Sequence, residues 1–323
     1  MEIKRIITNR RIDPHHANAL LYEWEEDLRD CFGADFHYNK PCQNKRYSKF
    51  IPFLLNFIQT SEPAFTFEMC IYRHSGNNKR NIIPCILDYY VHSPFLARLL
   101  FKCLYWRNPA VCVSSPEVYG FLSSLKASRR LHLLPQTLSD RYKISFDSKF
   151  DKQYDMFIAG RQNPILSEWF KMYCKAHPDT TFVYSKRLPN GDFRFFNQKD
   201  ECLSEDDSRE SYISFMRSSR ACMYSPQGID GSRKTNGFEQ VTPHFLEVVA
   251  CGCHPLLRYN KNIESDYFEL ASFCPHIDSY ELFEKLFDKA RITDVDMKIH
   301  SEYLKTHYTS VAAEKLKQIV SNL

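Results

Sequence analysis

The sequence predicts an α/β protein of two domains, each built around a mostly parallel sheet. The chain has 323 residues, which is too long for one ordinary core and suits two lobes with a cleft between them. Short β-branched or apolar runs alternate with longer segments of helical periodicity, which is typical of βαβ units. A polar stretch of mixed charge interrupts this alternation at 139–153. We therefore expect an N-terminal domain at 1–140, a linker at 141–153 and a C-terminal domain at 154–323.

In the N-terminal half, the apolar runs that predict strands lie at 4–8, 65–72, 82–90, 110–115 and 130–135. Helical periodicity indicates helices between them, at 17–31 and 117–126. The second helix follows Ser115 and Pro116, and proline suits the first helical position because its missing N–H costs little there.

In the C-terminal half, strands are expected at 155–160, 181–186, 221–226, 254–259 and 272–277. Helices should begin at Asn163-Pro164, after the polar stretch 205–209, and at Thr242-Pro243. The last of these should end at Gly252, because glycine readily takes the left-handed conformation that follows a helix. The tail at 298–320 also has helical periodicity.

The composition narrows the classes of function. The chain carries 43 Lys and Arg against 39 Asp and Glu, a net charge of +4, which is too small a surplus to indicate a dedicated nucleic-acid binder. Its 12 Cys are scattered, and Cys85, Cys112 and Cys222 lie in apolar strand-like runs. We interpret them as reduced core residues of a cytosolic protein. Cys251 and Cys253 lack the second ligand cluster of a zinc site, so no structural metal is expected.

The sequence predicts a cytoplasmic protein. It begins without the long apolar segment of a secretion signal, and no segment reaches the ~18 apolar residues that a transmembrane helix needs. The segment 93–108 has leucines at helical spacing, with Arg98, Lys102 and Arg107 among them. Such a helix either packs on its own sheet or lies on the inner face of a membrane, where a lipid-linked acceptor substrate would be located.

The most informative segment for chemistry runs from Ser225 to Leu257, between two expected strands. Its pattern is strand, long polar loop, capped helix and strand. In a doubly wound sheet, such a loop lies at the carboxyl ends of the strands, and the following helix directs its free N–H groups into the same crevice. A diphosphate would be well placed there, with Arg233 and Lys234 adding positive charge.

Two glutamates flank the start of this helix. Glu239 lies in the loop and Glu247 in the second turn. A carboxylate accepts two hydrogen bonds from neighbouring hydroxyls, so one of the pair could hold a ribose and the other a donor sugar. The alternative is that both are solvated helix-region glutamates.

At this point the sequence resembles a known family. The run E-QVTPHFL-E-VVACGCHPLL, from Glu239, is similar to the E-x7-E segment of GT-B glycosyltransferases of the group 1 type, which build polysaccharides and surface glycans. YDMFIAGRQNPIL at 154–166 resembles the first strand and loop of that family's C-terminal domain, and SSPEVYGFL with LHLLPQ resembles the end of its N-terminal domain. The resemblance implies two Rossmann-like domains facing across a cleft, with the C-terminal helix crossing back to the N-terminal domain.

The resemblance also implies which residues bind the donor. Gly160, Arg161 and Lys234 would approach the diphosphate, and Thr242 with the amides after it would complete the phosphate cradle. The alternative for Arg161 is an ordinary surface arginine beside a turn.

By the same resemblance, the two glutamates and a histidine would contact the rest of the donor. Glu247 would bind the ribose hydroxyls and Glu239 the hydroxyls of the donor sugar. His244 would touch the pyrophosphate or the sugar, and its alternative is a histidine on the helix surface.

Glu239 is also a candidate catalytic residue, and the candidates for the catalytic base lie in the N-terminal half. Asp13 and His15 follow the first expected strand, where an inverting GT-B enzyme often keeps its base, and Asp88 ends another strand. The loop that holds Asp13 lacks the glycine pair that many retaining members place beside the donor. Alternatively, Asp13 and Pro14 merely turn the chain.

These observations predict a glycosyltransferase that takes a sugar from a nucleotide-sugar donor to a glycan or lipid-linked acceptor, with retention favoured over inversion. No cofactor, metal or nucleic acid is expected, because positive side chains and a helix end can stabilise the leaving nucleotide. Asp294 and Asp296 have the spacing of a metal-binding pair but lie between two expected helices, so we interpret them as a helix start. The alternative function is a GT-B-like module that binds nucleotides or glycans without turnover.

Overall fold

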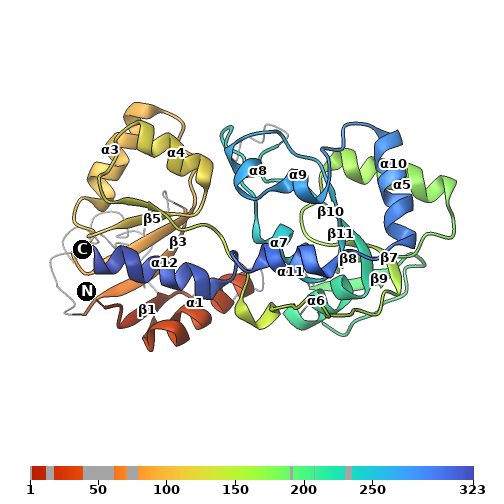
Figure 1. Ribbon diagram of the computed structural model, residues 1–323, viewed down its shortest axis with the longest axis horizontal. Helices are drawn as coiled ribbons and strands as arrows, with labels where there is room; N and C mark the ends of the chain where they lie inside the picture. Colours follow the sequence, from red (N-terminus) through yellow and green to blue (C-terminus); the bar gives the residue numbers. More distant parts are fainter. Residues whose placement is uncertain are drawn as a thin grey trace. The chain divides into compact units, whose positions relative to one another are not determined.

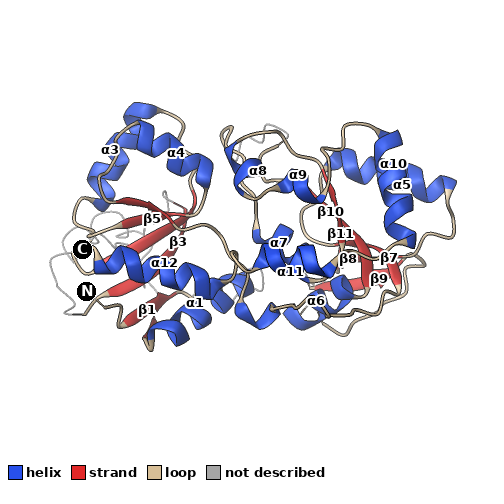
Figure 2. Ribbon diagram, in the orientation of Figure 1, coloured by secondary structure: helices blue, strands red, loops and turns tan. Residues whose placement is uncertain are grey.

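A computed structural model of the protein describes residues 2–11, 18–38, 62–70, 79–189, 192–206, 208–229 and 235–323. The chain divides into two units. Unit 1 comprises Met1–Arg141, Asp230–Gln240 and His307–Leu323, and unit 2 comprises Tyr142–Ile229 and Val241–Thr306. Each unit is an α/β structure around its own sheet (Figures 1 and 2).

The sheet of unit 1 has six strands in the order β2-β1-β3-β4-β5-β6, and every neighbouring pair is parallel. The strands are β1 (Arg5–Thr8), β2 (Asp35–Tyr38), β3 (Ala64–Cys70), β4 (Ile82–Asp88), β5 (Val111–Val113) and β6 (Leu131–Leu133). The central strands are mainly apolar, as expected of a parallel sheet that is covered on both faces, and Thr66 and Glu68 of β3 are buried polar exceptions.

Helices cover both faces of this sheet (Figure 1). They are α1 (Ala19–Phe32), α3 (Pro94–Tyr105), α4 (Pro116–Ser124) and α12 (Thr309–Ser321). Along β4 the side chains alternate: Cys85 packs in the core beneath α1 and α12, and Ile86 packs in the core beneath α3 and α4. The side chain of Ser93 caps α3 and that of Ser115 caps α4, each followed by a proline.

The sheet of unit 2 has five strands in the order β11-β10-β7-β8-β9, in which only the β8–β9 pair is antiparallel among the described strands. The strands are β7 (Tyr154–Ile158), β8 (Phe182–Arg187), β9 (Phe193–Asn197), β10 (Ser219–Tyr224) and β11 (His254–Leu257). The helices are α5 (Pro164–Ala176), α6 (Arg209–Arg217), α7 (Pro243–Ala250), α8 (Ile263–Tyr267), α9 (Leu270–Phe273), α10 (Tyr280–Ile292) and α11 (Met297–Leu304).

Adjacent residues of β8 show how the helices of unit 2 are shared between the two faces. Val183 packs in a core with Ile213 of α6 and Val248 of α7. Phe182, which points to the other face, contacts Phe170 of α5 with ring centroids 5.3 Å apart. The sheet therefore lies between α6 and α7 on one face and α5 on the other.

The α/β fold prediction is confirmed, and the C-terminal helix crosses back as expected. Ala313 and Leu316 of α12 are fully buried in the core of unit 1, together with Leu28 of α1. Because α12 completes that core, residues 307–323 belong to unit 1 and not to the expected C-terminal domain at 154–323. The expected tail helix also divides into α11 and α12, with 305–308 between them.

Two more boundaries differ from the expected ones. Residues 142–153, expected to be part of a linker, belong to unit 2, where the Lys152 ammonium donates to the carbonyl oxygens of Ser219 at 2.8 Å and Cys251 at 2.9 Å. Residues 235–240 lie within the expected C-terminal domain but belong to unit 1. The chain therefore passes between the units at more than one point.

Of two further predictions about single elements, one is confirmed and one is wrong. The expected end of a helix at Gly252 is confirmed: α7 ends at Ala250, and Gly252 has a φ of +62°. A Cβ at Gly252 would lie 2.9 Å from a ring carbon of Phe150, so only glycine fits. The strand expected at 272–277 is wrong, because Leu270–Phe273 forms α9 and residues 274–278 after it have no regular secondary structure.

Candidate functional site

Unit 2 has a topological switch point between β7 and β10. From β7 the chain continues through α5 to β8 on one side, and from β10 it continues through α7 to β11 on the other side. At such a point the two loops leave the carboxyl ends of adjacent strands in opposite directions, and ligands of doubly wound sheets bind in the crevice between them. This is the position at which the sequence predicts a diphosphate.

Gly160 and Arg161 lie in the loop that follows β7. The Arg161 side chain donates from Nη2 to the carbonyl oxygen of Ser225, at 3.2 Å, in the loop that follows β10. Gly160 has a φ of +68°, and a Cβ built on it would meet no atom within 4 Å. Glycine is therefore required there by its backbone conformation and not by crowding. The structure thus brings an exposed guanidinium to the switch point, as the sequence predicts.

The start of α7 is the second part of this region. The backbone N–H of Thr242 donates to the Tyr224 hydroxyl oxygen at 2.7 Å, and the N–H of Val241 donates to Oε2 of Glu264 at 3.3 Å. The Thr242 side chain does not cap the helix, and its hydroxyl lies 3.4 Å from that of Tyr224. The Thr242 amide, at the start of the expected phosphate cradle, therefore already has a protein partner, as does the Val241 amide before it.

Glu247 has a different setting from the expected one. Its side chain is 3% exposed and forms an ion pair with Arg209, the first residue of α6. The Tyr212 hydroxyl donates to Oε2 at 3.4 Å. Burial favours a higher pKa for Glu247, but Arg209 and His244 outweigh it and lower the pKa to about 2. The carboxylate is thus charged and enclosed between α6 and α7, with no open side for the expected ribose.

His244 lies in the same cluster. Its Nδ1 is 2.6 Å from the Tyr212 hydroxyl, and its Nε2 is 3.6 Å from Sγ of Cys222 in the middle of β10. Because both ring nitrogens contact protein groups, His244 packs against the sheet and is not a solvated residue of the helix surface. Direct contact with a donor would require the cluster to open.

Glu239 belongs to unit 1, so the two glutamates of the expected pair are anchored in different units. Its backbone N–H donates to Oε2 of Glu117, in the first turn of α4, at 2.9 Å. The next residue, Gln240, donates to the carbonyl oxygen of Leu87 at 2.8 Å. Phe238 stacks on His92 with ring centroids 4.2 Å apart. These contacts hold residues 235–240 against the carboxyl ends of β4 and β5.

The carboxyl ends of β4 and β5 therefore gather acidic groups. Burial raises the pKa of Asp88, the last residue of β4, to about 6. The pKa of Glu117 is also raised, first by burial and then by the neighbouring charge of Glu239. A carboxyl group whose pKa is raised above its ordinary value is suited to acid or base chemistry. The other expected candidates, Asp13, His15 and Lys234, lie outside the described residues.

The described residues contain no group of three or more His, Cys, Asp or Glu side chains that could hold a metal ion. Asp296 accepts from the backbone N–H of Lys298 at 2.9 Å and so caps α11, and Asp294 pairs with Arg220 at 3.0 Å. The expectation that these two aspartates mark a helix start is confirmed for Asp296. Cys85, Cys112 and Cys222 are buried free thiols in strands, as expected.

One exposed apolar surface lies on α3, in the segment that the sequence marks as a packing or membrane helix. Ala97, Phe101 and Tyr105 face the core of unit 1. On the opposite side, large apolar side chains are exposed: Phe95, Leu96, Leu99 and Trp106. We call these four residues the α3 surface. No helix in the described part of the chain is both long and apolar enough to cross a bilayer.

Sequence reasoning missed several residues of these clusters. Arg209 and Tyr212 hold Glu247, and Glu117 and His92 hold the segment around Glu239. Arg209 carried one usable signal, because a basic residue in the first turn of a helix opposes the helix dipole and indicates an acidic partner. The other contacts join segments that are far apart in the sequence, and no local sequence pattern indicates them.

Comparison with known proteins supports the fold. No protein-family model and no curated protein matches the chain. The solved structure of AviGT4, a glycosyltransferase involved in avilamycin A biosynthesis, is similar with a TM-score of 0.52 and 9% identity, over 99% of this chain and 97% of that one. A putative UDP-N-acetylglucosamine 2-epimerase from Listeria monocytogenes is similar with a TM-score of 0.53 and 10% identity, over 99% and 96% of the chains. Both similarities extend over almost the whole chain and so include both sheets. The chain therefore has the GT-B fold of two Rossmann-like domains.

Proposed function

We propose that the chain is a glycosyltransferase that moves a sugar from a nucleotide-sugar donor to a glycan or lipid-linked acceptor. The observation that carries this proposal is the exposed Arg161 guanidinium beside Gly160, hydrogen-bonded to Ser225 at the switch point of unit 2. A doubly wound sheet binds the phosphates of a nucleotide at that position. A sugar as the transferred group is suggested by AviGT4, whose chain shares this fold over nearly its full length.

Unit 2 would bind the donor. Arg161 would contact the diphosphate, Gly160 would let the backbone approach it, and the Thr242 hydroxyl would lie at the amino-terminal end of α7. Lys234, which lies outside the described residues in the segment 230–240 of unit 1, is proposed as a further contact with the diphosphate. A guanidinium that is preorganised before the substrate binds and the positive end of a helix both stabilise the negative charge that develops on a departing diphosphate. These groups are the basis for proposing transfer without a metal ion.

Unit 1 would supply the proton chemistry. The acceptor hydroxyl oxygen forms the new bond to the anomeric carbon, the bond from that carbon to the diphosphate oxygen breaks, and the hydroxyl proton passes to a base. We propose Glu239 as a catalytic group, since its backbone is fixed to Glu117 at the carboxyl ends of β4 and β5. Asp13 and His15, which follow β1, are the other candidates for a base, which takes the proton in this way when the configuration is inverted. For retention, which we propose, the acceptor oxygen attacks on the face that the diphosphate leaves, and the hydroxyl proton passes to the departing phosphate oxygen, with Glu239 placed to assist that transfer.

We assign Glu247 a positioning role in place of ribose binding. Its carboxylate fixes Arg209 at the start of α6 and Tyr212 one turn later, and so couples α6 to α7. Because α7 begins at Thr242, a shift of Glu247 would move the end of the helix that faces the switch point. The expected effect on nucleotide affinity is therefore indirect.

We also propose that the protein works in the cytoplasm, on polysaccharide or surface-glycan precursors, in peripheral contact with the inner face of a membrane. The α3 surface supports this, because its apolar side chains are accompanied by Arg98 and Lys102 on the exposed side of α3. Such a helix combines apolar burial in the lipid interface with attraction to anionic headgroups.

A second candidate is a module that binds nucleotides or glycans without turnover. One observation favours it: the Glu247 carboxylate and the Thr242 amide, both expected to bind the donor, already have protein partners. A pure binding module would keep affinity for a nucleotide and form no transferred product.

The test begins with a panel of nucleoside diphosphates in thermal denaturation. A ligand present at a hundred times its Kd adds about 2.7 kcal/mol to stability, which shifts the melting temperature measurably. The Arg161→Gln variant should lose this shift, and Lys175→Gln, which removes an exposed charge from α5, should keep it. Equal shifts in both variants would refute the assigned site. The nucleotide sugars of any diphosphate that binds are then assayed for transfer and hydrolysis, and binding without product favours the second candidate.

A further inference from the structure

A cationic pocket lies at the amino-terminal edge of the sheet of unit 1. It has a volume of 690 Å³. Its basic residues lie at the starts of three neighbouring strands, with Arg80 before β4, Arg107 before β5, and Arg129, Arg130 and His132 at β6, and the end of α12 also lines it. In a parallel sheet the amino ends of all strands lie at one edge, opposite the carboxyl ends. The pocket is therefore separate from the acidic cluster of the same unit.

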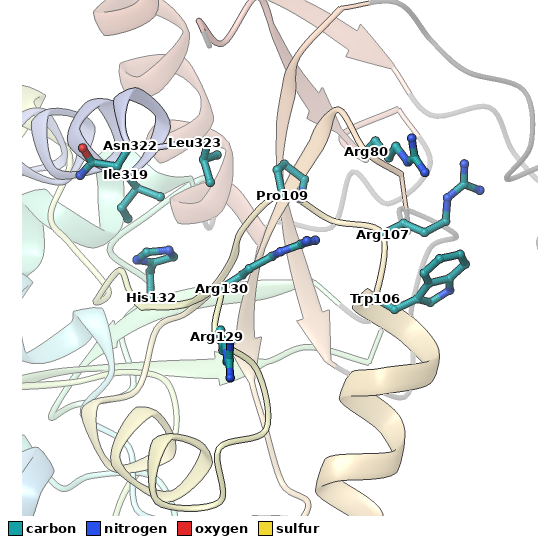
Figure 3. Close-up of a pocket in the computed structure, with 10 residues that line it drawn as sticks. All are labelled: Arg80, Trp106, Arg107, Pro109, Arg129, Arg130, His132, Ile319, Asn322 and Leu323. Carbon is teal, nitrogen blue, oxygen red and sulfur yellow. The ribbon is translucent and has the colours of Figure 1, made fainter.

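The arginines approach the pocket from different segments (Figure 3). Arg80 and Arg107 lie near each other, beside Trp106 at the end of α3, and the Arg130 side chain extends toward Pro109. None of the described residues that line the pocket has a side-chain carboxylate. The side chains of the described lining therefore carry a net positive charge.

The pocket has a fixed wall. Arg130 donates from Nη1 to the carbonyl oxygen of Asn108 at 2.9 Å. Asn108 is fully buried, and its side-chain amide donates to the carbonyl oxygen of Ile82 at 2.8 Å. These bonds tie the turn before β5 to the starts of β4 and β6, so the wall is preorganised before any ligand arrives.

The electrostatic cost of this arrangement indicates what it binds. The pKa of Lys79, next to Arg80, is lowered first by burial and then by the positive charges of Arg5 and Arg107. Within the described residues, no acidic partner accompanies Arg80 or Arg129. Several guanidinium groups around one cavity repel each other, and an anion would relieve that repulsion while accepting paired N–H donors from each planar fork.

We propose that this pocket binds a phosphate-bearing anion, either a free phosphorylated compound or the phosphate of a membrane lipid headgroup. Its volume falls in the range of ligand pockets, about 300–1,000 Å³. Arginine suits phosphate because it presents two parallel donors to two phosphate oxygens and keeps its charge at all relevant pH values. The proposal is independent of donor binding in unit 2.

The first measurement is calorimetric titration of the full chain with inorganic pyrophosphate. The variant Arg80→Gln/Arg107→Gln should bind at least about tenfold more weakly, because it removes two charged groups that donate paired hydrogen bonds to phosphate. The matched control Lys171→Gln/Lys285→Gln removes two exposed charges from helices of unit 2 and should keep the wild-type affinity. Arg80→Lys/Arg107→Lys keeps the charge without the fork and should give an intermediate affinity.

Hydrogen–deuterium exchange of the full chain with pyrophosphate locates the site. Protection is expected in peptides that cover 79–83 and 128–133, whereas a ligand bound only in unit 2 would protect peptides near Arg161. This separates the pocket from the proposed donor site. Far-UV circular dichroism of each variant checks that it is folded, and the lysine variant serves as the comparison if the glutamine variant unfolds.

The second arm uses vesicles of phosphatidylcholine with and without phosphatidic acid. Binding that requires phosphatidic acid and is lost in Arg80→Gln/Arg107→Gln identifies the lipid headgroup as the source of the phosphate. Pyrophosphate binding with protection at the pocket, without such vesicle binding, identifies a free anion. If neither probe protects the pocket peptides, or if the glutamine variant binds both probes as well as the control does, the proposal is overturned.

Discussion

Glu247 and Arg209 form a buried ion pair that joins the second turn of α7 to the first residue of α6. Removing one partner of a buried pair leaves the other charge without compensation and typically costs about 3–5 kcal/mol. We expect Glu247→Gln to lower the free energy of unfolding in urea by about 3 kcal/mol. Glu302→Gln, which breaks an exposed pair with Lys305, should change it by less than about 1 kcal/mol.

The same variant separates a positioning role from ribose binding. If Glu247 positions α6 and α7, then Arg209→Gln should weaken nucleotide binding as much as Glu247→Gln does, measured by calorimetry on folded protein. A direct ribose contact would instead make Glu247→Gln much the more harmful of the two.

Glu25 predicts a dependence of stability on pH. Burial raises its pKa from 4.5 to about 7, although the Thr8 hydroxyl, which donates to it at 2.5 Å, and Arg10 both oppose the rise. Between pH 4.5 and about pH 7, the folded state holds more protons at Glu25 than the unfolded state does. The contribution of Glu25 to the free energy of unfolding therefore falls as pH rises through this range. The change attributable to Glu25 should be about 3 kcal/mol.

The measurement is urea unfolding of the wild type and of Glu25→Gln at several pH values between 4.5 and 7.5. Other groups titrate in both proteins, so the informative quantity is the difference in unfolding free energy between them. That difference should move in favour of Glu25→Gln as pH rises. A difference that does not vary with pH would show that Glu25 keeps an ordinary pKa in the folded protein.

The sequence contained enough information to place most strands of both sheets and the loop that carries Gly160 and Arg161. The strands of both sheets are apolar runs bounded by polar loops, and the position of Gly160 and Arg161 follows from the rule that a loop leaves the carboxyl end of its strand. Strands β2 and β9 were not predicted, because β2 is an edge strand of four residues with half-exposed side chains and β9 pairs antiparallel outside the βαβ pattern.

The rest of the site depends on contacts between distant parts of the chain. Seven residues separate Glu239 from Glu247, yet the backbone of Glu239 is fixed by Glu117, which is 122 residues away in sequence. Helical periodicity and capping residues describe segments one at a time and cannot indicate such a partner. For the same reason the return of α12 was implied only by the family resemblance.

Glu239 should be required for turnover and not for donor affinity. We expect Glu239→Gln, which keeps the size of the side chain and its backbone hydrogen bond to Glu117, to lower kcat by about 10²–10⁴-fold, the range of general acid–base catalysis. Because the proposed donor site lies in unit 2, the Kd for the nucleoside diphosphate should stay within about twofold of the wild-type value.

The matched control is Glu314→Gln on α12, an exposed residue of the same unit. It should leave both kcat and Kd unchanged. Full activity of Glu239→Gln would exclude a catalytic role, and a loss of nucleotide affinity without a loss of kcat would return Glu239 to the donor-sugar contact that the sequence implies.

The α3 surface should control attachment to anionic vesicles. Phe95 is 78% exposed, and moving such a side chain from water into the lipid interface is worth about 1.5–3 kcal/mol. Phe95→Ser should therefore reduce cosedimentation with vesicles that contain an anionic lipid by at least about tenfold in affinity. Ile292→Ser is the matched control, because Ile292 is 82% exposed at the end of α10 in unit 2. Ile292→Ser controls for the removal of any exposed apolar side chain, so vesicle affinity should fall in Phe95→Ser alone. If both variants bind vesicles equally well, the α3 surface is not the membrane contact.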